Sequence, residues 1–219
     1  MLFAQQLTTQ SVKELEQECN KNNYLACGFL GLKYFNGMNV RQDKIKGIEL
    51  FTKACDSDEA ISCFNLANIY VDGDGVRQDK FKAFELYKKS CDNNYLLSCS
   101  NLGVLYDKGE GVRQDKFKAI ELFQKSCDNN NFGSCFNLGL SYSDGDGVPQ
   151  DKFKAFELYQ KACDGNHTNS CVNLGLMYSK GEGVRQDKSK ALSFYGKACD
   201  LKNQLGCKNY AILKSSGVN

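Results

Sequence analysis

The stretch that decides the fold is residues 63–99, which read CFNLANIYVDGDGVRQDKFKAFELYKKSCDNNYLLSC. Its pattern returns along the chain with a period of 36 residues, and the twelve cysteines form six pairs whose members lie eight residues apart. The pairs are Cys19 and Cys27, Cys55 and Cys63, Cys91 and Cys99, Cys127 and Cys135, Cys163 and Cys171, and Cys199 and Cys207. Self-similarity at a fixed period is typical of a solenoid of stacked repeats.

Each repeat is predicted to form two helices, called here helix A and helix B. In helix A, Cys63, Leu66, Ala67 and Tyr70 fall at i, i+3, i+4 and i+7 and make one apolar stripe. The small residue of this stripe recurs as glycine in later repeats and allows a neighbouring helix to come close. Residues 72–75, Asp-Gly-Asp-Gly, end helix A because glycine readily adopts the positive φ of a helix C-cap.

Helix B follows at once, with Asp79 as its predicted N-cap and Cys91 at its end. A lone B-like helix over residues 11–19 and a last A-like helix over 203–213 flank five complete hairpins. The predicted organisation is an N-terminal segment, one all-α solenoid and a C-terminal tail, with the boundaries 1–10, 11–213 and 214–219.

The paired cysteines indicate disulfides rather than a metal or redox site. The chain has no C-x2–4-C zinc knuckle and no C-x-x-C motif. Two regular connectivities are possible: eight apart, or 28 apart from Cys27 to Cys55 onward. The second leaves Cys19 and Cys207 unpaired, so we predict eight-apart bridges, each joining the end of one helix B to the start of the next helix A. Disulfides imply an oxidising compartment.

Composition narrows the possible functions. A net charge of +2, with 25% charged residues, gives no bulk attraction to nucleic acid or to an anionic membrane, and no nucleic-acid partner is predicted. No apolar run approaches the roughly 18 residues of a membrane span. The one histidine, His167, excludes a His-rich metal centre, and we predict neither metal nor cofactor. We expect a monomer.

The first six residues, MLFAQQ, have neither the basic region nor the apolar core of a signal peptide. Because disulfides require export, we expect a secreted or periplasmic chain from which the signal has been removed, with Met1 added for production.

The pattern Leu-Gly-x-x-Tyr-x-x-Gly-x-Gly-Val-x-x-Asp-x-x-Lys-Ala, which runs from Leu102 to Ala119, resembles the Sel1-like repeat of the tetratricopeptide-type α/α solenoids. The paired cysteines narrow this resemblance to the Helicobacter cysteine-rich proteins, over residues 11–213. The resemblance implies a right-handed superhelix, disulfides within the B–A units and residence outside the cytoplasm. Members of that family are described as penicillin-binding proteins or weak β-lactamases and as secreted proteins that engage host cells.

The residues themselves give no catalytic site. Serine β-lactamases need Ser-x-x-Lys, Ser-Asp-Asn and Lys-Thr-Gly, and the chain contains none of these. A Ser-His-Asp triad would need His167, which lies in a predicted turn where a solvated histidine is expected. Hydrolysis therefore rests on the resemblance alone, and binding of a β-lactam or peptidoglycan-like ligand in a groove remains an alternative.

Two loop motifs have ordinary explanations. The Asp-Gly-Asp-Gly loops at 72–75 and 144–147 begin like a calcium loop but lack the later ligands, so they are interpreted as turns. Asn166 lies in the chain's single Asn-x-Thr acceptor, with Asp164 before it, which makes it a possible glycosylation site.

The predicted ligand surface is the outward side of helix A. One asparagine recurs there in each repeat, beside a set of apolar or polar neighbours. The asparagines are Asn65, Asn101, Asn137 and Asn173; the neighbours are Phe64, Asn68, Val104, Phe136, Leu140 and Leu176. Amides can donate to and accept from an extended peptide backbone, and a spacing of about 10 Å between repeats matches about three extended residues. We predict a concave groove for an extended peptide or protein tail, host proteins included; the alternative is that the asparagines bond neighbouring helices.

Overall fold

A computed structural model describes residues 10–218, and over that range it contains twelve helices and no strand. The chain forms two compact units, residues 1–114 and 115–219, each of which repeats the same helical hairpin. The first unit contains α2 (Val12–Asn20), α3 (Tyr24–Asn36), α4 (Lys44–Asp56), α5 (Ala60–Asp72), α6 (Lys80–Asp92) and α7 (Leu96–Lys108). The second contains α8 (Lys116–Asp128), α9 (Phe132–Asp144), α10 (Lys152–Asp164), α11 (Thr168–Lys180), α12 (Lys188–Asp200) and α13 (Gln204–Ser215).

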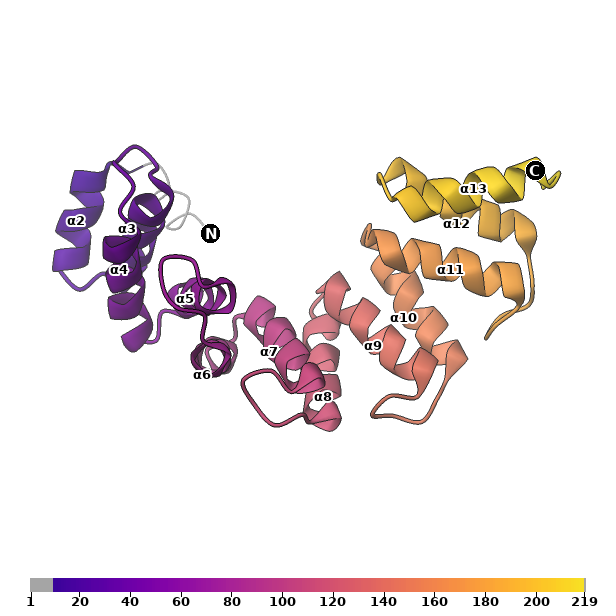
Figure 1. Ribbon diagram of the computed structural model, residues 1–219, viewed down its shortest axis with the longest axis horizontal. Coiled ribbons are helices and arrows are strands. Elements are labelled where there is room, and N and C mark those ends of the chain that lie inside the picture. Colours follow the sequence, from indigo (N-terminus) through magenta and orange to yellow (C-terminus); the bar gives the residue numbers. More distant parts are fainter. Residues whose placement is uncertain (1–9, 219) are drawn as a thin grey trace. The chain divides into compact units, whose positions relative to one another are not determined.

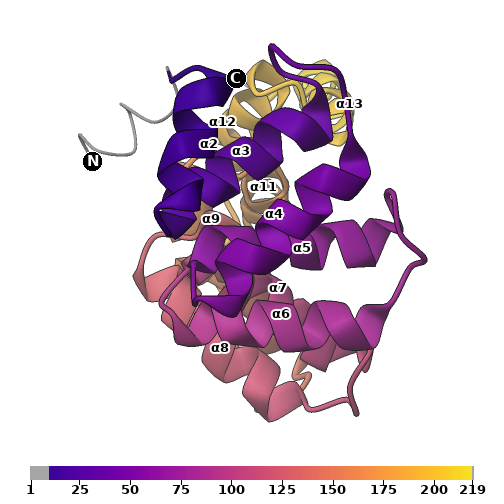
Figure 2. The ribbon, with the colours of Figure 1, turned by 90° about the vertical axis from the view of Figure 1, so that its left-hand side faces the viewer.

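Successive helices in each unit pack as hairpins (Figure 1), with odd-numbered helices as helix A and even-numbered ones as helix B. Figure 2, in which the first unit faces the viewer, shows α5 and α6 side by side. The expected helix count and the hairpin architecture are confirmed, and both units are all-helical over the residues that the structure describes.

Local signals fix the helix ends. Every helix A from α3 to α11 ends on a glycine in the left-handed region, such as Gly73 with φ 71°. Each helix B from α4 to α12 begins after an aspartate, and the Asp79 side chain accepts a hydrogen bond from the Lys82 backbone N–H. This bond satisfies one of the donors that a helix N-terminus leaves free. The predicted caps at Gly73 and Asp79 are confirmed.

The turn from helix B to the next helix A is equally regular. One residue in each turn has a positive φ between 62° and 67°, although none is glycine; these residues are Asn22, Asp58, Asn94, Asn130, Asn166 and Lys202. Asparagine and aspartate tolerate this conformation better than other non-glycine residues do, which explains five of the six positions. The lysine at 202 has no such local explanation.

Six disulfides, all eight apart in sequence, cross these turns. They join α2 to α3, α4 to α5, α6 to α7, α8 to α9, α10 to α11 and α12 to α13. A lysine of the next helix B braces several of them: Lys161 Nζ donates to the Cys127 carbonyl at 2.7 Å, and Lys197 Nζ to the Cys163 carbonyl at 2.7 Å. Each bridge therefore stabilises the junction between adjacent repeats.

Each unit has its own core of helix-A stripe residues packed against helix B. Buried Leu15, Cys27 and Leu30 belong to one cluster of the first unit, and buried Leu174, Met177 and Tyr195 to the cluster of the second. The small stripe residue has the expected role: a Cβ at Gly139 would lie 2.6 Å from the Tyr159 ring, which is below any real contact. Glycine there lets helix B lie directly on helix A.

Candidate functional site

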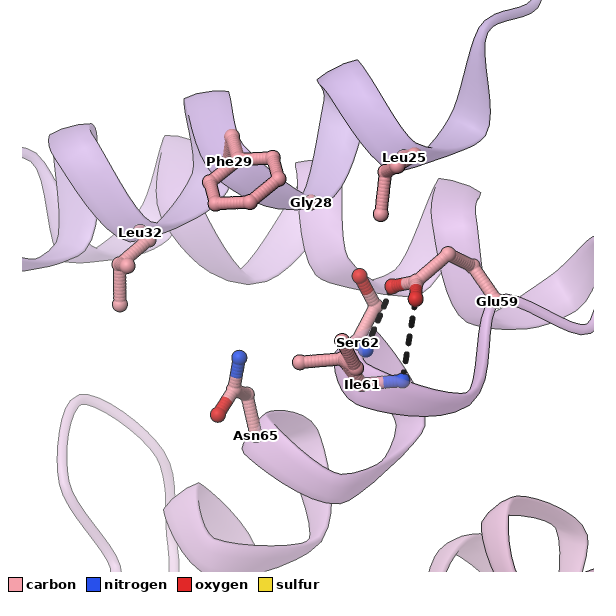
Figure 3. A pocket seen from close by; sticks show the side chains of 8 residues that line it. All are labelled: Leu25, Gly28, Phe29, Leu32, Glu59, Ile61, Ser62 and Asn65. Carbon is pink, nitrogen blue, oxygen red and sulfur yellow. Dashed lines mark hydrogen bonds between the residues drawn. The ribbon is translucent and has the colours of Figure 1, made fainter. Parts of the chain in front are cut away.

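A groove runs between α3 and α5 in the first unit (Figure 3). Leu25, Phe29 and Leu32 line it from α3, and Ile61 and Asn65 line it from α5. The cavity has a volume of about 40 Å³ and is open to solvent on one side. Its walls are apolar, and its polar atoms come from the α5 side.

The groove exists because α3 has a glycine in its N-terminal half. Gly28 occupies the repeat position of Phe64 and Phe136, so the first repeat lacks the aromatic ring that two of the later repeats place there; the other two have Ser100 and Val172. A Cβ at Gly28 would come within 2.5 Å of the Ser62 Oγ, so the backbone approaches α5 more closely than a side chain allows.

The base of this groove contains a buried polar atom without a partner. Ser62 is fully buried, and its Oγ makes no hydrogen bond. The equivalent Ser98 donates to Ser90 Oγ at 2.6 Å, whereas the residue opposite Ser62 is Ala54, which has no hydroxyl. A buried hydroxyl without a hydrogen bond costs about 1–3 kcal/mol, which a ligand in the groove would offset.

Glu59 closes one end of the groove. Its carboxylate accepts from the backbone N–H groups of Ile61 at 3.1 Å and Ser62 at 2.7 Å and so caps α5 (Figure 3). At the other end a second hollow of about 200 Å³ adjoins, lined by Phe35, Asn68 and Asp72 among others. Both hollows include Leu32 and Asn65, so the surface continues along α3 and α5.

The four asparagines of the predicted ladder are all half-buried, but they are not equivalent. The Tyr87 hydroxyl hydrogen-bonds to Asn101 and donates to Asn68 Oδ1, and the Tyr159 hydroxyl hydrogen-bonds to Asn173. Burial raises the pKa of both tyrosines, so their hydroxyls stay protonated. In these two repeats the asparagine bonds a neighbouring helix.

The other two asparagines have free amides within the described residues. Fourteen residues before Asn65 and Asn137 stand Phe51 and Phe123, which have no hydroxyl where the other repeats have tyrosine. Asn65 lies on the groove, and Figure 3 shows its amide directed toward α3. The period alone does not separate the two kinds of asparagine. The residue fourteen positions earlier does, because it is tyrosine before a bonded asparagine and phenylalanine before a free one. The prediction of a uniform ladder did not take this difference into account.

The predicted aromatic neighbours pack within the protein. The Phe64 ring lies 6.0 Å from that of Tyr87 and 5.1 Å from that of Tyr95, and the Phe136 ring lies 5.9 Å from that of Tyr159. Val104 and Leu140 are half-buried, and Leu176 is exposed. These side chains separate into aromatic clusters and isolated surface positions rather than one row of pockets.

His167 differs from the expectation of a solvated turn residue. It is half-buried, its ring lies 4.7 Å from that of Phe136, and burial lowers its pKa. Its Nδ1 is 3.0 Å from Ser170 Oγ, so this contact gives the fully buried serine a hydrogen-bond partner. The pair closes a packed cluster and gives no support to the β-lactamase interpretation.

The remaining motifs lie in turns. Asn166 is exposed between α10 and α11, at a positive φ. In the acidic loops Asp74 pairs with Lys44, and Asp146 pairs with Lys116 at 2.6 Å. Among residues 10–218, no three Cys, His, Asp or Glu side chains gather as a metal site, and no helix is both long and apolar enough to cross a bilayer.

This array of helical hairpins is an architecture of known proteins, and the chain belongs to the Sel1 repeat family. The family profile matches residues 25–59, 60–95, 96–131, 133–167 and 168–203. Sel1 repeat proteins mediate protein–protein interactions. A search of curated protein sequences found no match.

Two solved structures share this fold. The chain is similar to a protective antigen of uropathogenic Escherichia coli with an SLR fold, at 29% identity and a TM-score of 0.93. The match covers 96% of this chain and 45% of the antigen, so this chain spans less than half the length of that protein. A Sel1 repeat protein from Oxalobacter formigenes shares the fold at 23% identity and TM-score 0.82, over 86% of this chain and 75% of that one. The Helicobacter pylori cysteine-rich protein B is 30% identical over 60% of this chain and 94% of its own, with TM-score 0.49. The six disulfides indicate an oxidising, extracytoplasmic location.

Proposed function

We propose that the protein is a secreted or periplasmic adaptor that binds an extended peptide segment of a partner, an envelope or host protein, along α3 and α5. The observation that carries this proposal is the groove in which the Asn65 amide and the buried Ser62 hydroxyl both lack a partner. Two polar groups left without hydrogen bonds beside apolar walls are expected where a ligand supplies the missing bonds.

The chemistry of the groove fits an extended polypeptide. The Asn65 amide can donate to a backbone carbonyl and accept from a backbone N–H of the same peptide unit. Leu25, Phe29 and Ile61 offer apolar contact to one side chain of that peptide, and the small cavity sets an upper limit on its size. A medium-sized side chain, with a hydroxyl able to reach Ser62, satisfies every group in the groove.

Asn137 is the corresponding free amide of the second unit, and we propose that it contacts a peptide backbone in that unit by itself. Asn101 and Asn173 are assigned to bonds between helices, because each side chain is already hydrogen-bonded to a tyrosine hydroxyl. Asn68 also has this structural role, because its Oδ1 accepts a hydrogen bond from the Tyr87 hydroxyl. The ladder is therefore divided into two binding and two structural members.

The test selects peptides on the wild-type protein from a phage-displayed random library and measures their affinity by titration calorimetry. Asn65→Ala is expected to weaken binding by about 1–3 kcal/mol, because the peptide unit it grips loses both hydrogen bonds, and to leave the melting temperature unchanged. The matched control, Asn101→Ala, is expected to lower the melting temperature and retain affinity. Equal affinity of wild type and Asn65→Ala would exclude the groove as the peptide site.

A further inference from the structure

One repeat position carries an exposed hydrophobic residue that neither the core nor the groove uses. It is the second residue of helix B, and in four repeats its side chain is strongly exposed: Ile45 69%, Phe81 63%, Phe117 78% and Phe153 60%. Single exposed hydrophobic residues are common, but here large ones recur at one position of four successive repeats. Ile45 and Phe81 lie in the first unit, and Phe117 and Phe153 in the second.

Cations surround each of these residues. Lysines stand on both sides of it in sequence, as in Lys80-Phe81-Lys82, and an arginine lies four residues before it in three of the four repeats, as Arg41, Arg77 and Arg113. Those arginines are exposed and form no ion pair or hydrogen bond within the described residues. We call the arginine, the two lysines and the hydrophobic residue together the corner of the repeat.

A shallow depression lies beside Phe81, formed by its neighbours and not by its own side chain. It has a volume of about 700 Å³, and its charged lining residues are Arg77, Asp79, Lys80 and Lys82, with Tyr70 beside them. Lys80 pairs with Glu110 at 2.8 Å, and Lys82 Nζ lies 5.1 Å from the centre of the Tyr70 ring. Arg77, Lys80 and Lys82 thus contribute three positive charges, and Glu110 and the capping Asp79 contribute two negative ones. The net charge of these five side chains is therefore +1, and Arg77 forms no ion pair within the described residues.

We propose that the corners dock the protein on the surface of a bilayer that contains anionic phospholipid. The exposed phenylalanines would enter the boundary between headgroups and acyl chains, and the arginines and the basic depression would contact lipid phosphates. A bilayer fits these observations because a large hydrophobic residue between two lysines recurs in four repeats, three of them with the arginine. A laterally uniform partner can engage each corner by the same contacts, whereas a folded protein would offer each corner a different surface. The modest net charge of the whole chain does not oppose this, since the attraction is local.

The chain supplies its own neutral substitution for a test. In the last repeat the corner residue is Ser189, the second residue of α12, which begins at Lys188 like its counterparts. Serine at this position is therefore compatible with the helix start. The triple variant Phe81→Ser, Phe117→Ser, Phe153→Ser removes the exposed rings, and Leu97→Ser removes an exposed leucine (47% exposed) away from the corners as a matched control.

Flotation with phosphatidylcholine vesicles, with and without about one third phosphatidylglycerol, measures the binding. Wild type and Leu97→Ser are expected to float with the anionic vesicles only. The triple variant is expected to lose binding roughly tenfold or more, because the apolar area that enters the interface is gone. The double variant Arg77→Gln, Arg113→Gln is expected to bind more weakly and to respond less to added salt.

Absence of wild-type binding to the anionic vesicles would overturn the proposal, and so would equal binding by the triple variant. A wild-type dimer that becomes a monomer in the triple variant, measured by light scattering, would assign the corners to self-association instead and also overturn it. If circular dichroism shows the triple variant unfolded, the arginine variant decides: unchanged binding by it overturns the proposal, and weaker, less salt-dependent binding supports it.

Discussion

The helix pairs α3–α5 and α9–α11 occupy equivalent places in the repeat pattern, yet one is open and the other is filled. In α9–α11 the Phe136 ring lies against those of Tyr159 and His167, and Tyr159 holds Asn173. In α3–α5 the corresponding residues are Gly28, Phe51, Glu59 and Asn65. The helices are arranged in the same way in both pairs, so a few side chains decide whether the space between two A helices is filled or forms a groove.

The difference rests on hydrogen-bond partners as much as on volume. Ser170 has His167 as its partner, whereas Ser62 faces Ala54 and has none. Removing one aromatic ring, one tyrosine hydroxyl and one imidazole leaves the same asparagine and serine without partners. A repeat protein can thus place a binding site in one repeat without altering the period that holds the solenoid together.

The largest effect is expected from reducing the disulfides, which both regions have in common. Reduction of all six disulfides should unfold both units near room temperature. Each short loop contributes roughly 2–3 kcal/mol in the loop-entropy model, and their sum rivals the stability of a whole domain. Thermal melts followed by circular dichroism, with and without dithiothreitol, measure this. An unchanged melting temperature after complete reduction would show that helix packing alone holds the repeats.

Exchange of the hydroxyl between the two regions should reverse their roles. Tyr159→Phe is expected to cost about 1–3 kcal/mol of stability, since the half-buried Asn173 amide loses its partner. Phe51→Tyr is expected to give Asn65 a partner and to weaken peptide binding. Denaturant melts and calorimetry with the selected peptides give both numbers. The comparison fails if Tyr159→Phe is neutral and Phe51→Tyr binds peptide normally.

Ser62→Ala should stabilise the free protein by about 1 kcal/mol, because it removes a buried hydroxyl without a hydrogen bond. Ser98→Ala is the control and should destabilise, since the hydrogen bond that Ser98 donates to Ser90 is lost and Ser90 keeps only its own bond to the Ala60 carbonyl. Urea denaturation curves distinguish the two signs. Destabilisation by Ser62→Ala would mean that the hydroxyl has a bonding partner in solution and that the groove is already satisfied without ligand.

The smallest expected effect is a pH dependence confined to the filled region. Burial lowers the pKa of His167 in the folded state, so the unfolded chain binds the proton more readily. The stability due to the neutral imidazole is complete above the unfolded pKa of about 6.5 and is lost as pH falls through the lower folded pKa. His167→Tyr, which copies Tyr95 of the earlier repeat, should remove this dependence. Unfolding free energies measured across this pH range test it, and an identical pH slope in the variant would contradict it.

Much of the fold follows from sequence because it is local. The 36-residue period, the caps at Gly73 and Asp79 and the eight-apart cysteines each act within one hairpin or one turn. These features recur in successive repeats, so a substitution at one position does not obscure the pattern. A helix cap, a positive φ at glycine and a short disulfide loop all depend on residues fewer than ten positions apart.

Only the tertiary structure decided which asparagines are free and where the groove lies. These depend on residues fourteen or more apart, such as Tyr87 with Asn101, and on an absence, the missing ring at Gly28. The periodic sequence made Asn65, Asn101, Asn137 and Asn173 look alike because it repeats their immediate neighbours. The repeats differ in the residues that form hydrogen bonds and packing contacts between helices. The sequence by itself therefore determined the solenoid and its disulfides, because these depend on local features that every repeat shares. The packing between helices decided which surface stays open.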